Sequence, residues 1–262
     1  MPIRALSTAA TGMIGQQQNI DVIADNLANV NTTGYKRSRA NFQDLFYQKL
    51  QPAGVTTSNG NQRPTPIEIG LGTRMVSTAK EHTQGAFEIT ENQFDWAMDG
   101  DGFFRITYLD GTERYTRDGS FKVDKDGRIV TNDGFPLADN ITVPPETVSL
   151  NVGQTGLVQA VLGDGTTQDL GQIQIAKFIN PSGLRSEGQN LFAITPASGD
   201  PITANPGAIG FGTLRQGVLE NSNVQVVTEL VNMIKAQRSF EINSNSIKVA
   251  DQMLQVVNNL RT

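Results

Sequence analysis

The stretch VVTELVNMIKAQRSFEINSNSIKVADQML, residues 226–254, carries an apolar side chain at every seventh position. These positions are Val226, Met233, Phe240, Ile247 and Leu254. An apolar repeat of seven residues is typical of an α-helix that packs along its length against other helices. From residue 218 to its end the chain contains neither proline nor glycine, so no helix-breaking residue interrupts this pattern.

The opposite end of the chain has a similar pattern in IRALSTAATGMIGQQQNIDVIADNL, residues 3–27. Its apolar residues alternate at spacings of three and four, and only Gln17 departs from the series Ile3, Leu6, Ala10, Met13, Ile20, Ala24 and Leu27. We expect a helix over about residues 3–30 that stops at Gly34. Two such helices at opposite ends indicate pairing with each other or with other copies of the chain, and therefore assembly before catalysis.

The middle of the chain has the features of a β domain. Asp-Gly pairs begin at positions 110, 118, 126 and 133, and short runs of β-forming residues separate them. Asp-Gly is a strong hairpin signal, so we predict a β meander here, with further strands over residues 173–179 and 191–195. A shorter amphipathic segment, residues 39–50, places Phe42, Leu45, Phe46 and Leu50 on one helical face. We expect the last helix to open near the capping residues 221–223.

These patterns predict an α+β fold with long N- and C-terminal helices that pair into a coiled-coil-like layer, and with a mainly antiparallel β middle domain. We expect residues 1–33 and 221–262 to form the helical assembly domain. Residues 34–70 then connect it to a β-rich domain over residues 71–220.

The charge of the chain argues against nucleic acid as a partner. Net charge is −5, and residues 51–217 hold 19 acidic and 12 basic groups. A phosphate backbone requires clustered Lys and Arg, which an acidic middle does not supply. No run approaches the roughly 18 apolar residues of a membrane span, and polar residues interrupt the N-terminus too early for a cleaved signal peptide. We expect no direct membrane insertion.

The residues also offer little for catalysis. Cysteine is absent, which excludes disulfides, zinc-thiolate sites and thiol nucleophiles, and His82 is the only histidine. The Asp-rich turns at residues 99–102 and 124–127 lack the ligand spacing of a calcium loop and are explained as hairpin turns. The sequence predicts no catalytic, metal-binding or cofactor-binding residue, and we expect a protein that is not an enzyme.

Two polar regions allow more than one interpretation. Residues 16–31 carry seven uncharged amides and only two charges, Asp21 and Asp25. This composition suits contacts between packed subunits, although a polar solvent face remains an alternative. Residues 51–66, QPAGVTTSNGNQRPTP, have the composition of a mobile surface loop. Loops of this length without structure of their own are often functional in compact domains.

The run IADNLANVNTTGYK, residues 23–36, resembles the signature of the bacterial flagellar rod and hook family. The residues that carry this motif are Asn26, Leu27, Asn29, Gly34 and Tyr35. The C-terminal run, residues 221–244, resembles the closing helix of the same family, and residues 102–104 and 115–121 resemble its β core. The resemblance covers nearly the whole chain in order.

Within the family, the length of the chain is similar to that of distal rod subunits. The segment over about residues 46–66 resembles an insertion that distinguishes them from most hook subunits, and its Gln51, Pro52, Gly54 and Pro64 would make the rod rigid. The resemblance implies a structural subunit that self-assembles into a rigid helical tube and transmits torque from motor to hook. The subunit interface would then contain the repeat positions Ile3, Leu6, Ala10, Met13, Ile20 and Leu27 with Val226, Met233, Phe240, Ile247 and Leu254.

The same resemblance implies partners and a location. The partners would be further copies of the chain, proximal rod and hook subunits, periplasmic and outer-membrane ring proteins, and the flagellar type III export apparatus. The location would be the basal body, in the distal rod that spans the periplasm, reached without a cleaved signal. A proximal rod or hook subunit is the alternative within the family. A β-rich enzyme or binding module is the alternative outside it.

Overall fold

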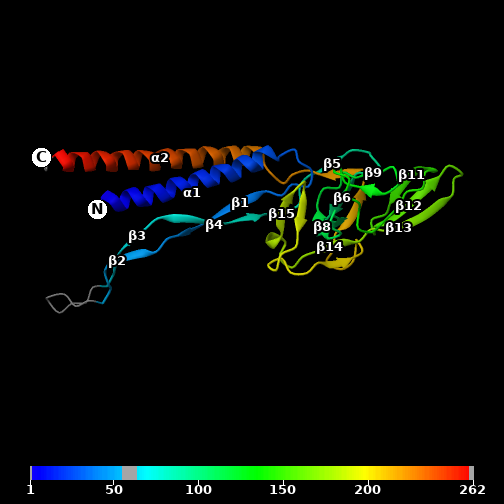
Figure 1. The fold of residues 1–262 in the computed structure, drawn as a ribbon, viewed down its shortest axis with the longest axis horizontal. Helices are drawn as coiled ribbons and strands as arrows, with labels where there is room; N and C mark the ends of the chain where they lie inside the picture. The colour runs from blue at the N-terminus through cyan, green and yellow to red at the C-terminus, as the bar shows by residue number, and fades with distance from the viewer. Residues whose placement is uncertain (1, 55–63, 260–262) are drawn as a thin grey trace. The chain divides into compact units, whose positions relative to one another are not determined.

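The structure is a computed structural model that describes residues 2–54 and 64–259 (Figure 1). The chain divides into two compact units. The helical unit consists of residues 1–27, 38–79 and 225–262, and the β unit consists of residues 28–37 and 80–224. The secondary structure is therefore α+β, as the sequence predicts.

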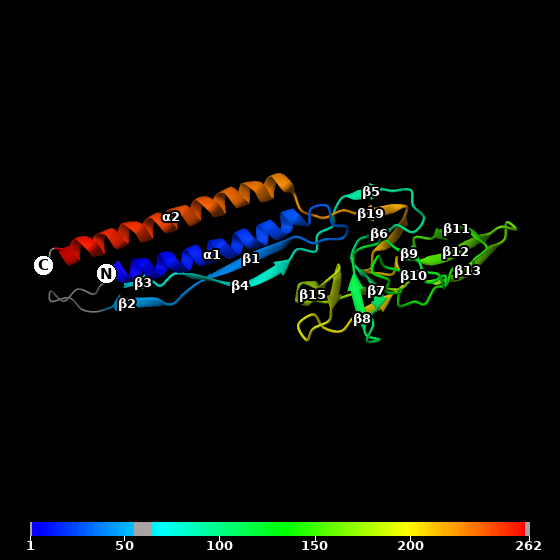
Figure 2. The ribbon, with the colours of Figure 1, turned by 45° about the horizontal axis from the view of Figure 1, so that its top comes forward.

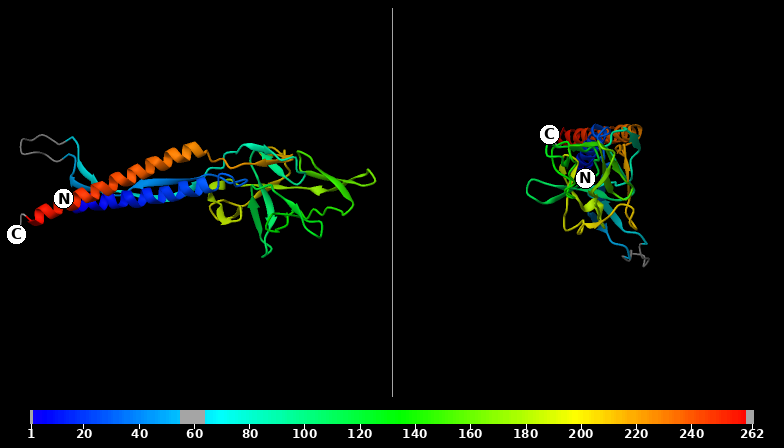
Figure 3. Two further views of the ribbon diagram at one scale, coloured as in Figure 1. Left: turned by 90° about the horizontal axis from the view of Figure 1, so that it is seen from above. Right: turned by 90° about the vertical axis from the view of Figure 1, so that its right-hand side faces the viewer.

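The helical unit contains two long helices, α1 (Pro2–Ala28) and α2 (Val226–Asn259). They lie side by side in every view, and both chain termini are at the same end, so the helices are antiparallel (Figures 2 and 3). Gly12 of α1 faces Asn243 of α2 so closely that an added Cβ would lie 2.9 Å from the Asn243 amide nitrogen. The glycine weakens α1 as an isolated helix but lets the two helices approach each other.

A β ribbon packs on α1 in the same unit. Strand β1 (Ser38–Asp44) pairs with β4 (Thr73–Lys80), and β2 (Tyr47–Gln51) pairs antiparallel with β3 (Ile67–Gly70). A Cβ at Gly15 of α1 would be 3.3 Å from the Phe42 ring, so the ribbon touches the helix there.

The expected amphipathic helix over residues 39–50 is therefore wrong. Phe42, Leu45, Phe46 and Leu50 have helical spacing, but this segment forms β1 and β2 instead. The backbone of each strand pairs with a strand from residues 67–80, on the far side of the loop. Long-range strand pairing overrides a local helical pattern because it satisfies the backbone hydrogen bonds while the helix α1 supplies a surface to pack on.

The β unit is built mainly on a six-stranded sheet in the order β15-β16-β8-β7-β14-β17, in which every neighbouring pair of strands is antiparallel. These strands are β7 (Phe103–Thr107), β8 (Glu113–Thr116), β14 (Ile175–Lys177), β15 (Arg185–Gly188), β16 (Leu191–Ala193) and β17 (Ile202–Ala204). A three-stranded sheet joins β11 (Thr147–Val152), β12 (Leu157–Leu162) and β13 (Thr167–Gln172). The predictions of strands near residues 173–179 and 191–195 are confirmed by β14 and β16.

Short antiparallel pairs complete the β unit. They are β5 (Phe87–Ile89) with β19 (Val218–Glu220), β6 (Trp96–Asp99) with β18 (Thr213–Gln216), and β9 (Lys122–Val123) with β10 (Ile129–Val130). A short 3₁₀ helix, η1, covers Pro181–Gly183. The main core includes Trp96, Phe104, Ile106, Leu150 and Ile173.

Three of the four Asp-Gly pairs make the predicted turns. Gly111 joins β7 to β8, Gly127 joins β9 to β10, and Gly134 follows β10, all with positive φ. The prediction of a turn at residues 118–119 is wrong, because the backbone of Gly119 is bound to the core: its carbonyl accepts a hydrogen bond from the Trp96 N–H at 3.0 Å.

The start of α2 also differs from the expectation. The helix begins at Val226, whereas Asn223 binds other backbone segments. Its side-chain oxygen accepts the Arg37 N–H at 2.7 Å, and its nitrogen donates to the Glu81 carbonyl at 2.8 Å. Asn223 therefore joins three segments of the β unit instead of capping a helix.

Candidate functional site

A buried network of charges fixes the segment that follows α1 within the β unit. Glu220 accepts a hydrogen bond from Lys36 Nζ at 2.7 Å and another from Arg117 Nε at 2.5 Å. Arg117 also donates to the backbone carbonyls of Met98, Gly100 and Gly102. All three charged side chains are almost fully buried, and buried charges are tolerated when they are paired and hydrogen-bonded in this way.

The charge of Glu220 is stabilised by its partners. Burial alone would raise the pKa of this carboxyl group, but the guanidinium of Arg117 and the ammonium of Lys36 outweigh it. The N–H of Gly85 adds a further hydrogen bond at 2.9 Å. The pKa of Glu220 therefore lies below its ordinary value, and Glu220 is ionised at neutral pH.

One of the family-motif residues of the β unit, Gly34, touches the backbone of this network. Gly34 has φ +67°, and its N–H donates to the Glu220 carbonyl at 2.8 Å. A Cβ at this position would lie 2.6 Å from the carbonyl carbon of Arg117, so only glycine fits. The half-buried Tyr35 ring lies 4.8 Å from Lys80 Nζ, and Asn29 accepts a hydrogen bond from the Thr32 hydroxyl. The motif thus fixes the chain segment between α1 and β1.

Asn26 holds the helical unit together. Its side chain exchanges two hydrogen bonds of 2.8 Å with the backbone of Ser38, one donated and one accepted. The same amide nitrogen lies 3.5 Å from a carboxylate oxygen of Glu229 on α2. Asn26 is fully buried and thus binds β1 to α1 at the point where both approach α2. Next to it, Leu27 is half-buried.

The repeat positions predicted for α1 lie beside its most buried line. Leu6, Ala10, Met13, Ile20 and Leu27 are half-buried in the single subunit, whereas Ala24 is exposed. The side chain of Ile3 lies outside the described part of the chain. The buried positions are Ala9, Gly15, Ile23 and Asn26, and of these Ala9, Ile23 and Asn26 each precede a predicted repeat position by one residue. The predicted line therefore still has accessible surface for a further contact.

Helix α2 has two different apolar faces. On the first face, Glu229, Ala236 and Ala250 are buried, and the predicted positions Met233, Phe240, Ile247 and Leu254 are half-buried beside them. Val226 is exposed. The second face is opposite and carries the outer stripe, which we define as Val227, Val231, Ile234, Ile242, Val249, Met253 and Val256. Every residue of the outer stripe is exposed, up to 75% for Val227 and 64% for Ile242.

A groove of about 480 Å³ adds a second accessible region to the helical unit. Its wall consists mostly of small residues from α1, α2 and β3, and Arg4 contributes a guanidinium nitrogen that is buried. Among the described residues, this nitrogen has no hydrogen-bond partner. A buried donor without a partner is costly, so an acceptor supplied from outside the subunit would be favourable here.

The ribbon that leads to the predicted insertion is also exposed. Phe46, just before β2, and Tyr47, Leu50 and Ile67 on β2 and β3 all have large accessible fractions, 88% for Phe46. Gln51, Pro52, Gly54 and Pro64 are exposed as well, and residues 55–63 lie outside the described part of the chain. A two-stranded hairpin alone is marginally stable in water, so an apolar ribbon of this kind favours a partner.

The sequence did not reveal the charged network. Lys36 and Arg117 lie within the runs 23–36 and 115–121, but no local pattern pairs them with Glu220, which is 184 positions from Lys36. A buried role could have been suspected from their position directly beside Tyr35 and Thr116. Among the described residues no cluster of His, Cys, Asp or Glu could hold a metal ion, and no described helix is long and apolar enough to cross a membrane.

Family models match three parts of the chain. Residues 6–36 match the flagella basal body rod protein, residues 97–160 the flagellar hook protein FlgE/F/G D1 domain, and residues 215–260 the flagellar basal body rod FlgEFG protein C-terminal. The first match contains the 23–36 motif and the third contains α2, so both terminal helices are included.

Full-length relatives agree with these matches. The flagellar basal-body rod protein FlgG of Buchnera aphidicola subsp. Schizaphis graminum is 46% identical over 98% of this chain and 100% of its own length. The protein of the same name from Borreliella burgdorferi is 46% identical over 99% of both chains. That from Bacillus subtilis is 40% identical, again over 99% of both. With this identity over essentially all of each chain, the chain belongs to the FlgG family of flagellar basal-body rod proteins.

Proposed function

We propose that this chain is the structural subunit of the distal flagellar rod and that copies of it polymerise through their terminal helices into a rigid helical tube. The observation that carries the proposal is the outer stripe of α2. Seven apolar side chains on one helix are exposed in the single subunit, directly opposite the face that contacts α1. Exposed apolar side chains gathered on one face of a helix mark an interaction site.

A second copy of the chain is the natural occupant of the outer stripe. Its α1 keeps half-buried repeat positions, so an α1 from a neighbouring subunit can add a third helix and form a coiled-coil-like layer. The groove beside Arg4 supports the same interpretation, because its buried guanidinium nitrogen has no acceptor among the described residues and a neighbouring copy could supply one. A tube arises when each copy offers one face and receives another, since such head-to-tail contacts repeat along a helix.

The exposed ribbon and residues 51–66 would brace neighbouring subunits in this tube. Phe46, Tyr47 and Leu50 would be covered by an adjacent copy, and the contact would oppose sliding between subunits as the tube bends. Rigidity in torsion follows from large, tightly packed contacts. The subunit then transmits torque from motor to hook.

Family membership also supports a proposed location and proposed partners. The tube would span the periplasm, join proximal rod subunits to hook subunits, and pass through periplasmic and outer-membrane ring proteins. The subunit would reach this position through the flagellar type III export apparatus without a cleaved signal. Both terminal helices would pack as an inner layer, with the β unit as the outer wall.

A charge in the outer stripe tests the proposal. Ile242→Asp places a carboxylate at the centre of the stripe, while Gln237→Asp puts the same charge on an exposed position of α2 outside it. A buried unpaired charge is costly, so the first variant should fail to form tubes in sedimentation and electron microscopy, with an unchanged thermal transition of the monomer. The second should assemble normally. Normal assembly of both variants would show that the outer stripe is no interface.

A further inference from the structure

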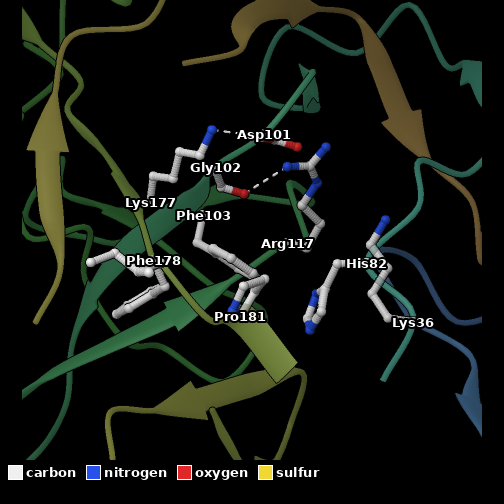
Figure 4. Close-up of a pocket in the computed structure, with 10 residues that line it drawn as sticks. Lys36, His82, Asp101, Gly102, Phe103, Arg117, Lys177, Phe178 and Pro181 are labelled. Carbon is white, nitrogen blue, oxygen red and sulfur yellow. Dashed lines mark hydrogen bonds and ion pairs between the residues drawn. The ribbon is translucent and has the colours of Figure 1, made fainter. Parts of the chain in front are cut away.

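A cavity of about 180 Å³ lies in the β unit next to the buried charge network (Figure 4). Three cations line it: Lys36, Arg117 and Lys177. Apolar residues, among them Phe103 and Phe178, form much of the rest of the wall. The cavity therefore combines positive charge with an apolar surround.

His82 lies in the wall of the cavity, with Lys36, Arg117 and Pro181 around it (Figure 4). Its ring packs edge-on against Phe103, with centroids 5.6 Å apart, and against Phe192 at 6.1 Å. Both ring nitrogens are buried and have no hydrogen-bond partner among the described residues. A phenylalanine would pack equally well without this cost, so packing alone does not account for an imidazole at this position.

The charges around His82 leave a positive surplus. Glu220 is shared between Lys36 and Arg117, and Asp101 pairs with Lys177 at 2.9 Å. Two carboxylates thus face the three cations in the wall of the cavity, and Lys80 is a further cation near His82. The β unit as a whole has 19 acidic and 12 basic residues, which makes this cavity an exception on an acidic surface.

His82 is uncharged at neutral pH. Burial lowers its pKa, and the nearby cations Lys36, Lys80 and Arg117 lower it further, to about 4. The backbone of Pro181 raises this pKa slightly, although it forms no hydrogen bond with the ring. A neutral imidazole keeps one N–H donor, and that donor has no acceptor among the residues that the structure describes.

We propose that this cavity receives the carboxylate of an Asp or Glu side chain from a second copy of the chain. The carboxylate would accept the His82 N–H and neutralise the surplus positive charge. A side chain fits better than a free inorganic anion because Ile179, 82% exposed, and Pro181 add apolar surface for a polypeptide to cover. The acidic β unit supplies the complementary charge in every copy. This inference rests on the proposed self-assembly.

Two substitutions test whether His82 and the cavity bind a carboxylate or whether His82 only packs against its aromatic neighbours. His82→Phe keeps the aromatic contacts and removes the N–H, so the monomer should be as stable as the wild type or more stable at pH 7. Its critical concentration for tube formation should nevertheless rise by about tenfold or more, since hydrogen bonds to charged groups are among the stronger ones. Lys177→Glu should also weaken assembly, whereas Lys122→Glu, on an exposed strand outside the cavity, should have little effect.

The single histidine gives a direct spectroscopic readout in the full-length chain. Acetate added to the monomer should shift the His82 ring resonances saturably and raise the pKa from about 4 towards the ordinary 6.5. Lys177→Glu should abolish the response. In assembled tubes the same rise should occur without acetate.

Three results would overturn the proposal. Acetate could leave the His82 pKa unchanged, His82→Phe could assemble with a wild-type critical concentration, or the His82 pKa could remain near 4 in the tubes. If any of these results is found while wild-type tubes still form, the cavity does not bind a carboxylate, but the proposed rod function is unaffected. Failure of the wild type to form tubes would remove the proposed function instead, and the acetate titration would still decide the chemistry of the cavity.

Discussion

Lys36 Nζ and Glu220 Oε1 lie 2.7 Å apart, although 184 positions separate the two residues in the sequence. Their side chains are 2% and 1% exposed. The pair, with Arg117 on the other carboxylate oxygen, joins the segment after α1 to the strand that precedes α2. Two parts of the chain that lead into the terminal helices are thus fixed within one β unit.

Loss of the shared carboxylate should destabilise the β unit. Glu220→Gln leaves two buried cations without a counter-charge, and the free energy of unfolding should fall by about 3–5 kcal/mol. Urea denaturation of the full chain measures this. As a matched control, Asp124→Asn removes a solvent-accessible partner of Arg128 and should have a much smaller effect. Equal effects of the two substitutions would contradict a structural role for the buried network.

Stability should depend on pH through His82. The folded pKa of about 4 lies below the unfolded 6.5, so between these values the unfolded chain binds a proton that the folded chain does not. Stability is therefore full above pH 6.5 and should fall by about 3 kcal/mol as pH drops to 4. Thermal unfolding of the monomer at several pH values measures the fall, and His82→Phe should abolish most of it. Glu220, with its lowered pKa, adds a further loss below about pH 4.5.

Gly34→Ala should be much more damaging than an alanine at an open turn. Gly34 and Gly111 have similar φ values, +67° and +76°, so both substitutions incur about 1–2 kcal/mol of backbone strain. Only at Gly34 does the new methyl group meet the Arg117 backbone, which adds about 1–3 kcal/mol for displaced structure. A difference in unfolding free energy between the two variants tests this. Identical losses would mean that the contact is easily relaxed.

Residues 51–66 should determine the straightness of the tube rather than the stability of the subunit. Gln51 and Ile67 are the last paired residues of β2 and β3. Replacing residues 52–66 with Asn-Gly therefore closes the ribbon with a two-residue hairpin turn. The variant should fold and polymerise, but its tubes should be curved or bendable in electron micrographs. Tubes as straight as the wild type would place rigidity elsewhere, with contacts between β units the next candidate.

The sequence predicted the terminal helices and most of the turns because their signals are local. The repeats that end at Leu27 and Leu254 each describe one helix, and Asp110-Gly111 describes one hairpin. The same local reading was wrong for residues 39–50, whose strand partners lie beyond the loop, and for Gly119, whose backbone is held by Trp96.

The candidate site was less predictable than the helices. The predicted heptad positions such as Met233 and Phe240 lie beside the packed face of α2, but the outer stripe with Val227 and Ile242 was not foreseen. A helix that is apolar on two sides has no single apolar repeat. The seven-residue series therefore identified one face of α2 and left the outer stripe unrecognised. The network of Lys36, Arg117 and Glu220 depends on contacts between distant segments, which no spacing in the sequence encodes.

Electron cryomicroscopy of tubes assembled from the wild-type chain tests self-assembly through the helices most directly. The side chains of the outer stripe, from Val227 to Val256, should be covered by a helix of a neighbouring copy along the whole length of α2. Tubes in which this stripe faces solvent, with the subunits joined only through other surfaces, would contradict assembly through the terminal helices.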